Sequence, residues 1–265
     1  MDYVTDNADR ACGGHATRVA MVTGGANGIG AAISQRLASE GFTVIVTDID
    51  LEAAQHLARE ITANGNRADP VRLDVSDAHS IGSVFAQLEG EYGRCDILVN
   101  NAGIAGVASF LDCPLELWLK VQAVNVTAPM LCGQRAARLM ARNGWGRIIN
   151  IASISGVRAG IGRTAYGTSK AALIGLTRQM AIELAESGIT ANCVAPGPIE
   201  TPLTRDHHSA ETRDAYRRSV PMRRYGQPSE IADTVVFLCS PGAAYITGHT
   251  VPVDGGFLAA GILDS

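Results

Sequence analysis

The sequence predicts an α/β fold in which a seven-stranded parallel sheet is covered by helices on both faces. Short aliphatic runs alternate with helical patterns along the 265 residues, and alternation of this kind implies right-handed crossovers between parallel strands. The composition is 46% hydrophobic but only 5% aromatic, with 29 glycines, which suits aliphatic strands buried on both faces and tight turns between elements. A glycine-rich turn directly after the first strand is the third indication.

The predicted elements follow one another in a regular order. We expect strands at residues 18–24, 42–48, 68–73, 97–100, 146–151, 189–195 and 250–253. We expect helices at residues 28–40, 51–64, 78–92, 115–142, 166–187 and 228–239. No internal repeat, linker or block of charge divides the chain, so residues 18–265 are predicted to form one domain.

One stretch breaks the alternation. Residues 196–224 are polar, rich in arginine and bounded by Pro-Gly and Pro-Met pairs. An insertion of this length in a compact domain is typical of a lid or a binding loop. We therefore expect a substrate lid at about residues 197–224, with a short helix of its own near residues 211–218.

Charge and composition argue against several classes of protein. A net charge of −4 gives no electrostatic footprint for nucleic acid or for an anionic membrane. The first 17 residues contain acidic side chains and no apolar core, which predicts a polar, flexible extension and not a signal peptide or membrane span. The six cysteines show no paired or His-associated spacing, so we expect free thiols in a reducing cytoplasm and no metal site.

The glycine-rich turn reads Thr-Gly-Gly-Ala-Asn-Gly-Ile-Gly at residues 23–30 and opens the first predicted helix. Glycines at such a turn let backbone amides and the N-terminus of the helix approach a pyrophosphate, whose negative charge the helix dipole stabilises. A strand-to-helix turn favours glycine in any case, so the motif gains weight only from its context.

That context is the carboxyl end of the following strands. Asp48 ends the second strand, 24 residues past Gly24, where a carboxylate could accept both ribose hydroxyls of NAD(H) and would repel the 2′-phosphate of NADP(H). Asp48 could instead cap the next helix, but Asp50 is better placed for that cap. Asp74 and Asn101 follow the third and fourth strands, at the sheet edge where ligands of such folds bind.

Tyr166 and Lys170 indicate the chemistry. Lys170 is one of only two lysines among 22 cationic residues, and a spacing of four places it on the same helix face as the phenol. A nearby cation lowers the pKa of a phenol, which is otherwise near ~10. Ser153 follows the fifth strand and could bond a substrate oxygen or cap a turn. Asn125 lies in an apolar helix, where its amide is either a structural hydrogen-bonding group or the holder of an ordered water.

Together these features resemble the classical short-chain dehydrogenase/reductase family over residues 18–257. The resemblance implies a Rossmann-type doubly wound sandwich and a catalytic tetrad of Asn125, Ser153, Tyr166 and Lys170. It also implies that residues 196–201 contact the nicotinamide. The expected cofactor-binding residues are Gly24, Asn27, Gly28, Ile29, Gly30, Asp48, Ile49, Asp74, Val75, Asn101, Ala102, Gly103, Tyr166, Lys170, Pro196, Gly197, Ile199 and Thr201.

The mechanism that follows is hydride transfer between a secondary alcohol or ketone and NAD(H). Tyr166 is expected to act as general base in oxidation and general acid in reduction, with Ser153 holding the reacting oxygen. Substrate contacts are expected from the loop after Ser153 and from the lid, at Ser155, Arg158, Arg163 and His207, or its neighbour His208. Any of these could equally be an ordinary solvated side chain.

Several alternatives stay open at this stage. A polyol or sugar-derived substrate fits Asp48, whereas a 3-oxoacyl-(acyl carrier protein) reductase, to which the sequence is also similar, would usually use NADPH. A non-catalytic NAD(H)-sensing protein is a more distant alternative, because a sensor needs no acid–base pair. The family resemblance implies a homotetramer assembled through the two long helices and the last strand.

Overall fold

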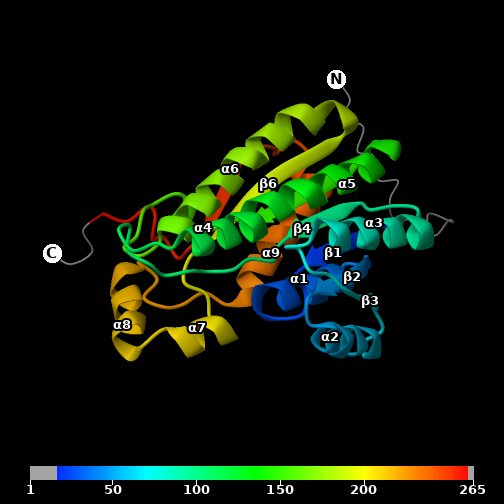
Figure 1. The fold of residues 1–265 in the computed structure, drawn as a ribbon. Coiled ribbons are helices and arrows are strands. Elements are labelled where there is room, and N and C mark those ends of the chain that lie inside the picture. The colour runs from blue at the N-terminus through cyan, green and yellow to red at the C-terminus, as the bar shows by residue number, and fades with distance from the viewer. Residues whose placement is uncertain (1–16, 262–265) are drawn as a thin grey trace, which may run out of the picture.

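The computed structural model describes residues 17–261, apart from the side chains of Leu203, Asp206 and His207, and contains the expected seven-stranded parallel sheet (Figure 1). The strands are β1 (Val19–Thr23), β2 (Thr43–Asp48), β3 (Arg67–Arg72), β4 (Ile97–Asn100), β5 (Gly146–Ile151), β6 (Ile189–Pro196) and β7 (Thr250–Val253). Their spatial order is β3-β2-β1-β4-β5-β6-β7. The order reverses between β1 and β4, and in doubly wound sheets a crevice for ligands opens at that point.

Helices cover both faces of this sheet. They are α1 (Gly28–Ser39), α2 (Leu51–Ala63), α3 (Ala78–Tyr92), α4 (Leu115–Gln122), α5 (Ala128–Arg142), α6 (Thr164–Leu184), α7 (Pro202–His207), α8 (Ala210–Ser219) and α9 (Pro228–Cys239). Figure 1 shows α3 to α6 over one face and α1, α2 and α9 over the other, while α7 and α8 stand off from both layers. The predicted Rossmann-type sandwich is confirmed.

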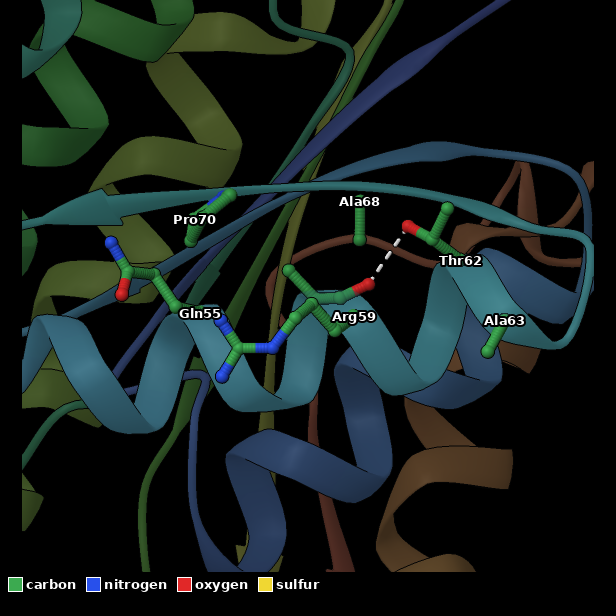
Figure 2. A pocket seen from close by; sticks show the side chains of 7 residues that line it. Gln55, Arg59, Thr62, Ala63, Ala68 and Pro70 are labelled. Carbon is green, nitrogen blue, oxygen red and sulfur yellow. Dashed lines mark hydrogen bonds between the residues drawn. The ribbon is translucent and has the colours of Figure 1, made fainter.

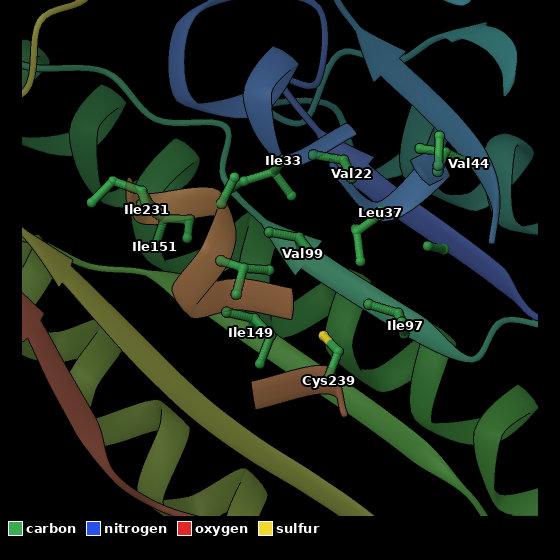
Figure 3. Packing of buried hydrophobic residues seen from close by; sticks show 14 of the residues in the cluster. Val22, Ile33, Leu37, Val44, Ile97, Val99, Ile149, Ile151, Ile231 and Cys239 are labelled. Atoms are coloured by element: carbon green, nitrogen blue, oxygen red, sulfur yellow. The ribbon is translucent and has the colours of Figure 1, made fainter. Parts of the chain in front are cut away.

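The core divides into two apolar layers because successive residues of a strand point to opposite faces. Val22 of β1 packs with α1, α2 and α9 on one face, whereas its neighbour Met21 packs with α3, α5 and α6 on the other. Figure 3 shows the first layer, in which Ile231 of α9 lies beside the β5 residue Ile151 and Cys239 lies beside Ile149. The central strands β1, β4, β5 and β6 are buried along their whole length, which is why they appear in the sequence as largely aliphatic runs, whereas the edge strand β3 is largely exposed.

The helix predicted at residues 115–142 is interrupted, which corrects the prediction of one continuous helix. Between α4 and α5 the backbone forms a π-helical turn at Ala123–Thr127. A π turn carries one extra residue, so it rotates the side chains that follow it relative to an unbroken α-helix, and such turns occur often at functional sites. Asn125 lies inside this turn and is fully buried.

The insertion at residues 197–224, for which a lid role was predicted, contains two helices where one was predicted. The helix expected near residues 211–218 is α8, and its prediction is confirmed. The second helix, α7, was not predicted because it spans only six residues and has no apolar periodicity. Its cap explains why it forms: Thr201 accepts a hydrogen bond from Thr204 N, the Thr204 hydroxyl accepts one from Thr201 N, and Pro202 occupies the first turn.

The sequence also made predictions about the N-terminal extension, the cysteines and membrane spans. The extension predicted at residues 1–17 lies outside the described residues except for Thr17, whose hydroxyl accepts a hydrogen bond from Arg67 Nη1 at 2.9 Å. The five described cysteines are all free thiols, and four of them are buried. Within residues 17–261 no helix has the length and apolar character needed to cross a membrane.

Candidate active site

The glycine turn joins β1 to α1 with almost no space above its backbone. Gly24 and Gly28 adopt positive φ angles of 59° and 53°, a region that side chains with a Cβ rarely occupy. A Cβ added to Gly30 would lie only 2.0 Å from the carbonyl oxygen of Gly24. The turn is therefore compact, and the amide end of α1 that follows it is open to an anionic group of a ligand.

This packing predicts that Gly30→Ala disables the turn. The added methyl group must displace the Gly24 carbonyl. This displacement would also shift the backbone amides of the turn that would face a pyrophosphate. We expect NAD(H) affinity, measured by calorimetry, to fall by on the order of 100-fold, the scale of a misplacement of about 1 Å. Gly90→Ala in α3 is the matched control, because a Cβ there meets nothing within 4 Å. Unchanged binding by the Gly30 variant would contradict the assignment of this turn.

Asn101 fixes the turn to the end of β4. Its Nδ2 donates to the carbonyl oxygens of Thr23 and Gly24 at 3.0 and 2.8 Å. The backbone amides of Asn101 and Ala102 both donate to Thr23 Oγ1, at 3.0 and 3.1 Å. The side chain of Asn101, predicted to contact a cofactor, thus acts on the shape of the turn, while Ala102 and Gly103 remain at the crevice.

Asp48 lies beside the glycine turn, as predicted. Its Oδ2 accepts a hydrogen bond from Ala26 N at 3.2 Å, and its Oδ1 accepts one from Asp50 N at 3.2 Å. Asp50 itself caps α2 by accepting from Ala53 N at 3.1 Å, which confirms the choice of Asp50 as the cap. Each oxygen of Asp48 keeps a free lone pair, so the carboxylate can still accept hydroxyl groups. The neighbouring Ile49 side chain is exposed.

Asp74 follows β3 and is held in a local turn. Its Oδ1 accepts hydrogen bonds from the backbone amide and the hydroxyl of Ser76, at 2.9 and 2.6 Å. These two bonds lower the pKa of Asp74 because they stabilise the charged form. The carboxylate is therefore fixed and ionised at the carboxyl edge of the sheet, with Val75 beside it.

Lys170 is buried beneath Tyr166 on α6. The side chain is 4% exposed, and its Nζ donates to the carbonyl oxygen of Ile151 at 2.8 Å. Nζ lies 5.8 Å from the centre of the Tyr166 ring, so the two side chains share one helix face. Burial lowers the pKa of Lys170 to about 8, because the charged ammonium loses its hydration in this position.

Opposing influences act on the pKa of Tyr166. Burial raises it, whereas a hydrogen bond with the Ser153 side chain and the positive charge of Arg163 lower it. Arg163 ends the loop that precedes α6, and its Cζ lies 5.8 Å from the centre of the Tyr166 ring. Its effect on the phenol was not anticipated from the sequence, where only Lys170 was considered as the cation. The nearby phenol of Tyr216 raises the pKa of Tyr166.

The Ser153 side chain makes hydrogen bonds both to the Tyr166 side chain and to the local backbone. It is almost fully buried just beyond β5, and its Oγ accepts a hydrogen bond from Ser155 N at 3.1 Å as the cap of a short 3₁₀ turn. The same hydroxyl bonds the Tyr166 side chain. The structure confirms Ser153 as a turn cap. Its hydrogen bond to a substrate oxygen stays a prediction.

Asn125 joins the loop after β4 to α6. Its Nδ2 donates to Ile104 O at 3.0 Å and to Ser169 Oγ at 2.9 Å, while its Oδ1 accepts from Ile104 N at 3.0 Å. A Cβ on Gly103 would lie 3.3 Å from Asn125 Oδ1 and 3.4 Å from Lys170 Nζ. The buried amide and the ammonium thus converge on Gly103. Holding a water for Lys170 stays a prediction for Asn125.

The segment after β6 folds back over the glycine turn. A Cβ on Gly28 would lie 3.6 Å from Thr201 Cγ2, and Ile199 is buried behind it. Gly197 packs against the backbone of Asp254, since a Cβ there would lie 2.7 Å from Asp254 Cα. These contacts place residues 197–201 beside the glycine turn and Asp254. Their contact with a nicotinamide stays a prediction.

The insertion brings aromatic side chains close to the tail after β7. The rings of Tyr216 and Phe257 lie 6.4 Å apart, and Tyr216 stacks on His208 at 5.4 Å. Arg158 Cζ lies 5.3 Å from the centre of the Phe257 ring. Tyr216 and Phe257 were not predicted as site residues. The sequence feature that could have identified them is the presence of aromatic residues, which are scarce in this chain, in the polar insertion and in the tail.

The described residues include three of the four predicted substrate side chains. The side chain of His207 lies outside the described residues, so no position is assigned to it. Ser155 contributes a backbone amide to Ser153, and its side chain makes no hydrogen bond among the described residues. Arg163 does approach Tyr166, and Arg158 reaches the lid through Phe257.

A separate hollow lies at the far edge of the sheet, between α2 and β3 (Figure 2). It encloses about 520 Å³ and is lined by Gln55, Ala58, Arg59, Thr62, Ala63, Ala68 and Pro70. The Thr62 hydroxyl is already bonded to Ala58 O at 2.8 Å. The hollow has no convergent reactive groups, so the cluster of polar side chains around Tyr166 is the better candidate site. Among residues 17–261, no three His, Cys, Asp or Glu side chains form a group that could hold a metal.

Comparison with known proteins gives a consistent family. A family model described as enoyl-(acyl carrier protein) reductase matches residues 24–258. The chain is 42% identical to the 3-oxoacyl-(acyl carrier protein) reductase FabG of Aquifex aeolicus over 240 residues, which cover 90% of this chain and 96% of the relative. It is 38% identical to the cis-4-hydroxycyclohexanecarboxylate dehydrogenase of Sinomonas cyclohexanicum, with coverage of 92% and 98%.

Solved structures agree. The crystal structure of a putative gluconate dehydrogenase from Agrobacterium tumefaciens superimposes with a TM-score of 0.90 at 32% identity, covering 92% of this chain and 96% of that one. Residues 24–258, which the family model matches, include Asn125, Ser153, Tyr166 and Lys170.

Proposed function

The chain belongs to the classical short-chain dehydrogenase/reductase family, and on this premise we propose that it is an NAD(H)-dependent oxidoreductase that interconverts a secondary alcohol and a ketone. The observation that carries the proposal is the grouping of Tyr166, Ser153 and Lys170 at the carboxyl end of β5, facing the crevice beside the glycine turn. Such a set can hold an oxygen and move its proton.

Side chains of the protein carry out the proton-transfer steps. In oxidation, Ser153 orients the substrate hydroxyl and Tyr166 accepts its proton, while the carbonyl forms as the hydride leaves the same carbon. In reduction, Tyr166 returns the proton to the alkoxide. A bound nicotinamide supplies the hydride acceptor or donor. Lys170, held by the Ile151 carbonyl, provides positive charge below the phenol and a donor toward a ribose hydroxyl.

The cofactor preference rests on Asp48. A carboxylate at the end of β2, beside the glycine turn, accepts ribose hydroxyls and repels a 2′-phosphate. Residues Asn27–Gly30 would hold the pyrophosphate, and Ile199 and Thr201 would contact the nicotinamide. We propose NAD(H) as the preferred cofactor for these reasons, although relatives include enzymes named as 3-oxoacyl-(acyl carrier protein) reductases.

Two substrate classes have support. Relatives named as dehydrogenases of gluconate and of a hydroxycyclohexanecarboxylate favour a polyol, sugar-derived or hydroxy acid substrate. The second class is a 3-oxoacyl thioester, favoured by the FabG similarity and by exposed apolar side chains near the mouth of the crevice: Val107, Phe110, Leu111 and Ile161. We favour the first class because its oxidative use fits NAD(H).

The assembly and setting are further parts of the proposal. Leu115 and Leu119 of α4 and Ile182 of α6 are exposed, which supports burial of these helices between subunits of a homotetramer. The free thiols support a reducing compartment such as the cytoplasm.

A substrate panel tests the function. Polyols, aldoses, hydroxy acids and 3-oxoacyl thioesters, each tested with NAD(H) and NADP(H), should give the highest kcat/KM for a hydroxylated small molecule with NAD. Asp48→Ser is expected to narrow the preference for NAD over NADP, since it removes the charge that repels a 2′-phosphate. Nucleotide binding without turnover across the whole panel would favour the sensing protein. Faster reduction of thioesters with NADPH would favour the reductase.

A further inference from the structure

Two arginines at the mouth of the crevice have no acidic partner within the described chain. Other arginines of the lid region are paired: Arg213 and Arg205 with Glu200, at 2.5 and 3.2 Å, and Arg224 with Glu230. By contrast, the side chains of Arg158 and Arg163 make no ion pair and no hydrogen bond among residues 17–261. Both belong to the loop between β5 and α6, and their positive charge is open to a ligand.

This loop is held in place at the reacting groups. Arg163 forms a parallel backbone bridge with Ala108 of the loop after β4, and Ala108 N donates to Gly162 O at 3.1 Å. The Arg163 guanidinium lies 5.8 Å from the centre of the Tyr166 ring. In a substrate whose carboxylate is bound to Arg163, only a few carbon atoms would therefore separate that carboxylate from the oxygen held by Ser153 and Tyr166.

Arg158 extends the positive region toward the lid. Its guanidinium lies 5.3 Å from the centre of the Phe257 ring, and Phe257 contacts Tyr216 of α8. Tyr216 in turn is close enough to Tyr166 to raise the pKa of the Tyr166 phenol. Arg158, Phe257 and Tyr216 thus form one cluster that joins the loop after β5 to α8.

We propose that the substrate carries a carboxylate near the reacting carbon, bound by Arg163 with Arg158 at the outer edge. The inference rests on the proposed oxidoreductase function and names its substrate class: a hydroxy acid or its oxo acid. A guanidinium presents a fork of donors that matches a carboxylate, and charge-assisted bonds of this kind are stronger than neutral ones.

The test compares hydroxy acids with their methyl esters. Each ester keeps the carbon skeleton and the reacting hydroxyl and removes only the negative charge. In Arg163→Gln, the ratio of kcat/KM for the acid to that for the ester should fall about 10- to 100-fold, the scale of a hydrogen bond to a charged group. Arg158→Gln should give a smaller fall, and Arg163→Lys should restore part of the ratio, since it keeps the charge without the fork.

Controls separate this inference from the function on which it rests. Arg59→Gln, on the exposed side of α2 (Figure 2), should leave the ratio unchanged. An unchanged ratio in Arg163→Gln would overturn the inference, and so would a wild-type enzyme that oxidises neutral alcohols but no hydroxy acid, although the proposed function would then stand. If kcat/KM of the two arginine variants falls only for carrier-protein thioesters, the arginines bind an acidic carrier surface, and the inference is overturned. Wild-type protein that oxidises nothing would instead remove the proposed function.

Discussion

Tyr166→Phe is expected to lower kcat for oxidation of the preferred alcohol by about 100-fold or more, the usual scale of general acid–base catalysis. The substitution removes one hydroxyl and keeps the ring that packs between Lys170 and Arg163. Ser153 retains its bond to Ser155 N, so the backbone at the end of β5 is not disturbed. The loss should therefore be in the chemical step and not in folding.

The measurement is turnover under saturating substrate, with NAD affinity determined by calorimetry on the same preparation. Affinity within about twofold of wild type would show that the crevice is intact. Ser153→Ala gives a matched comparison, because it removes the group that orients the substrate oxygen but leaves the base. A Tyr166→Phe enzyme that turns over at close to the wild-type rate would refute the role given to the phenol.

Lys170→Met is expected to remove the pH dependence that the buried ammonium creates, as well as most of the activity. Lys170 has a pKa of about 8 because of its burial, so it is charged below pH 8 and loses its charge as the pH rises through that value. Burial raises the pKa of Tyr166 above its ordinary value. In the wild type, the rate of ketone reduction should therefore fall as the pH rises through about 8, because Lys170 loses its charge there.

The pH profile of kcat/KM for ketone reduction distinguishes the variants. Lys170→Met should lack the break near pH 8 and lose roughly 100-fold in rate at neutral pH. Lys120→Met, at the only other lysine of the chain, is exposed on α4 and should keep the wild-type profile. If the break persists in Lys170→Met, the group that titrates near pH 8 is another residue.

The sheet and most helices were predictable because their signals are local. Buried parallel strands require aliphatic runs, and the turns between them require glycine at positions such as Gly24 and Gly28. The spacing of Tyr166 and Lys170 also fixes their shared helix face without any tertiary information. These features follow from short-range chemistry, and the structure agrees with them.

What the sequence did not give depends on contacts between distant segments. The π turn around Asn125 forms where the amide bonds Ile104, 21 residues away, and nothing in the apolar pattern marks that shift. The approach of Arg163 to Tyr166 depends on the bridge between Arg163 and Ala108. The contact between Tyr216 and Phe257 joins the lid to the tail after β7. None of these has a periodic or propensity signal.

Transfer of the carbinol hydrogen is the most direct test of the proposed oxidoreductase chemistry. A preferred secondary alcohol deuterated at the carbinol carbon would be incubated with the protein and NAD, and the nicotinamide product analysed by NMR. We expect deuterium at C4 of the reduced ring with wild type, and on the order of 100-fold less of it in the same time with Tyr166→Phe. Binding of NAD with no deuterium transfer from any alcohol of the panel would contradict the proposal.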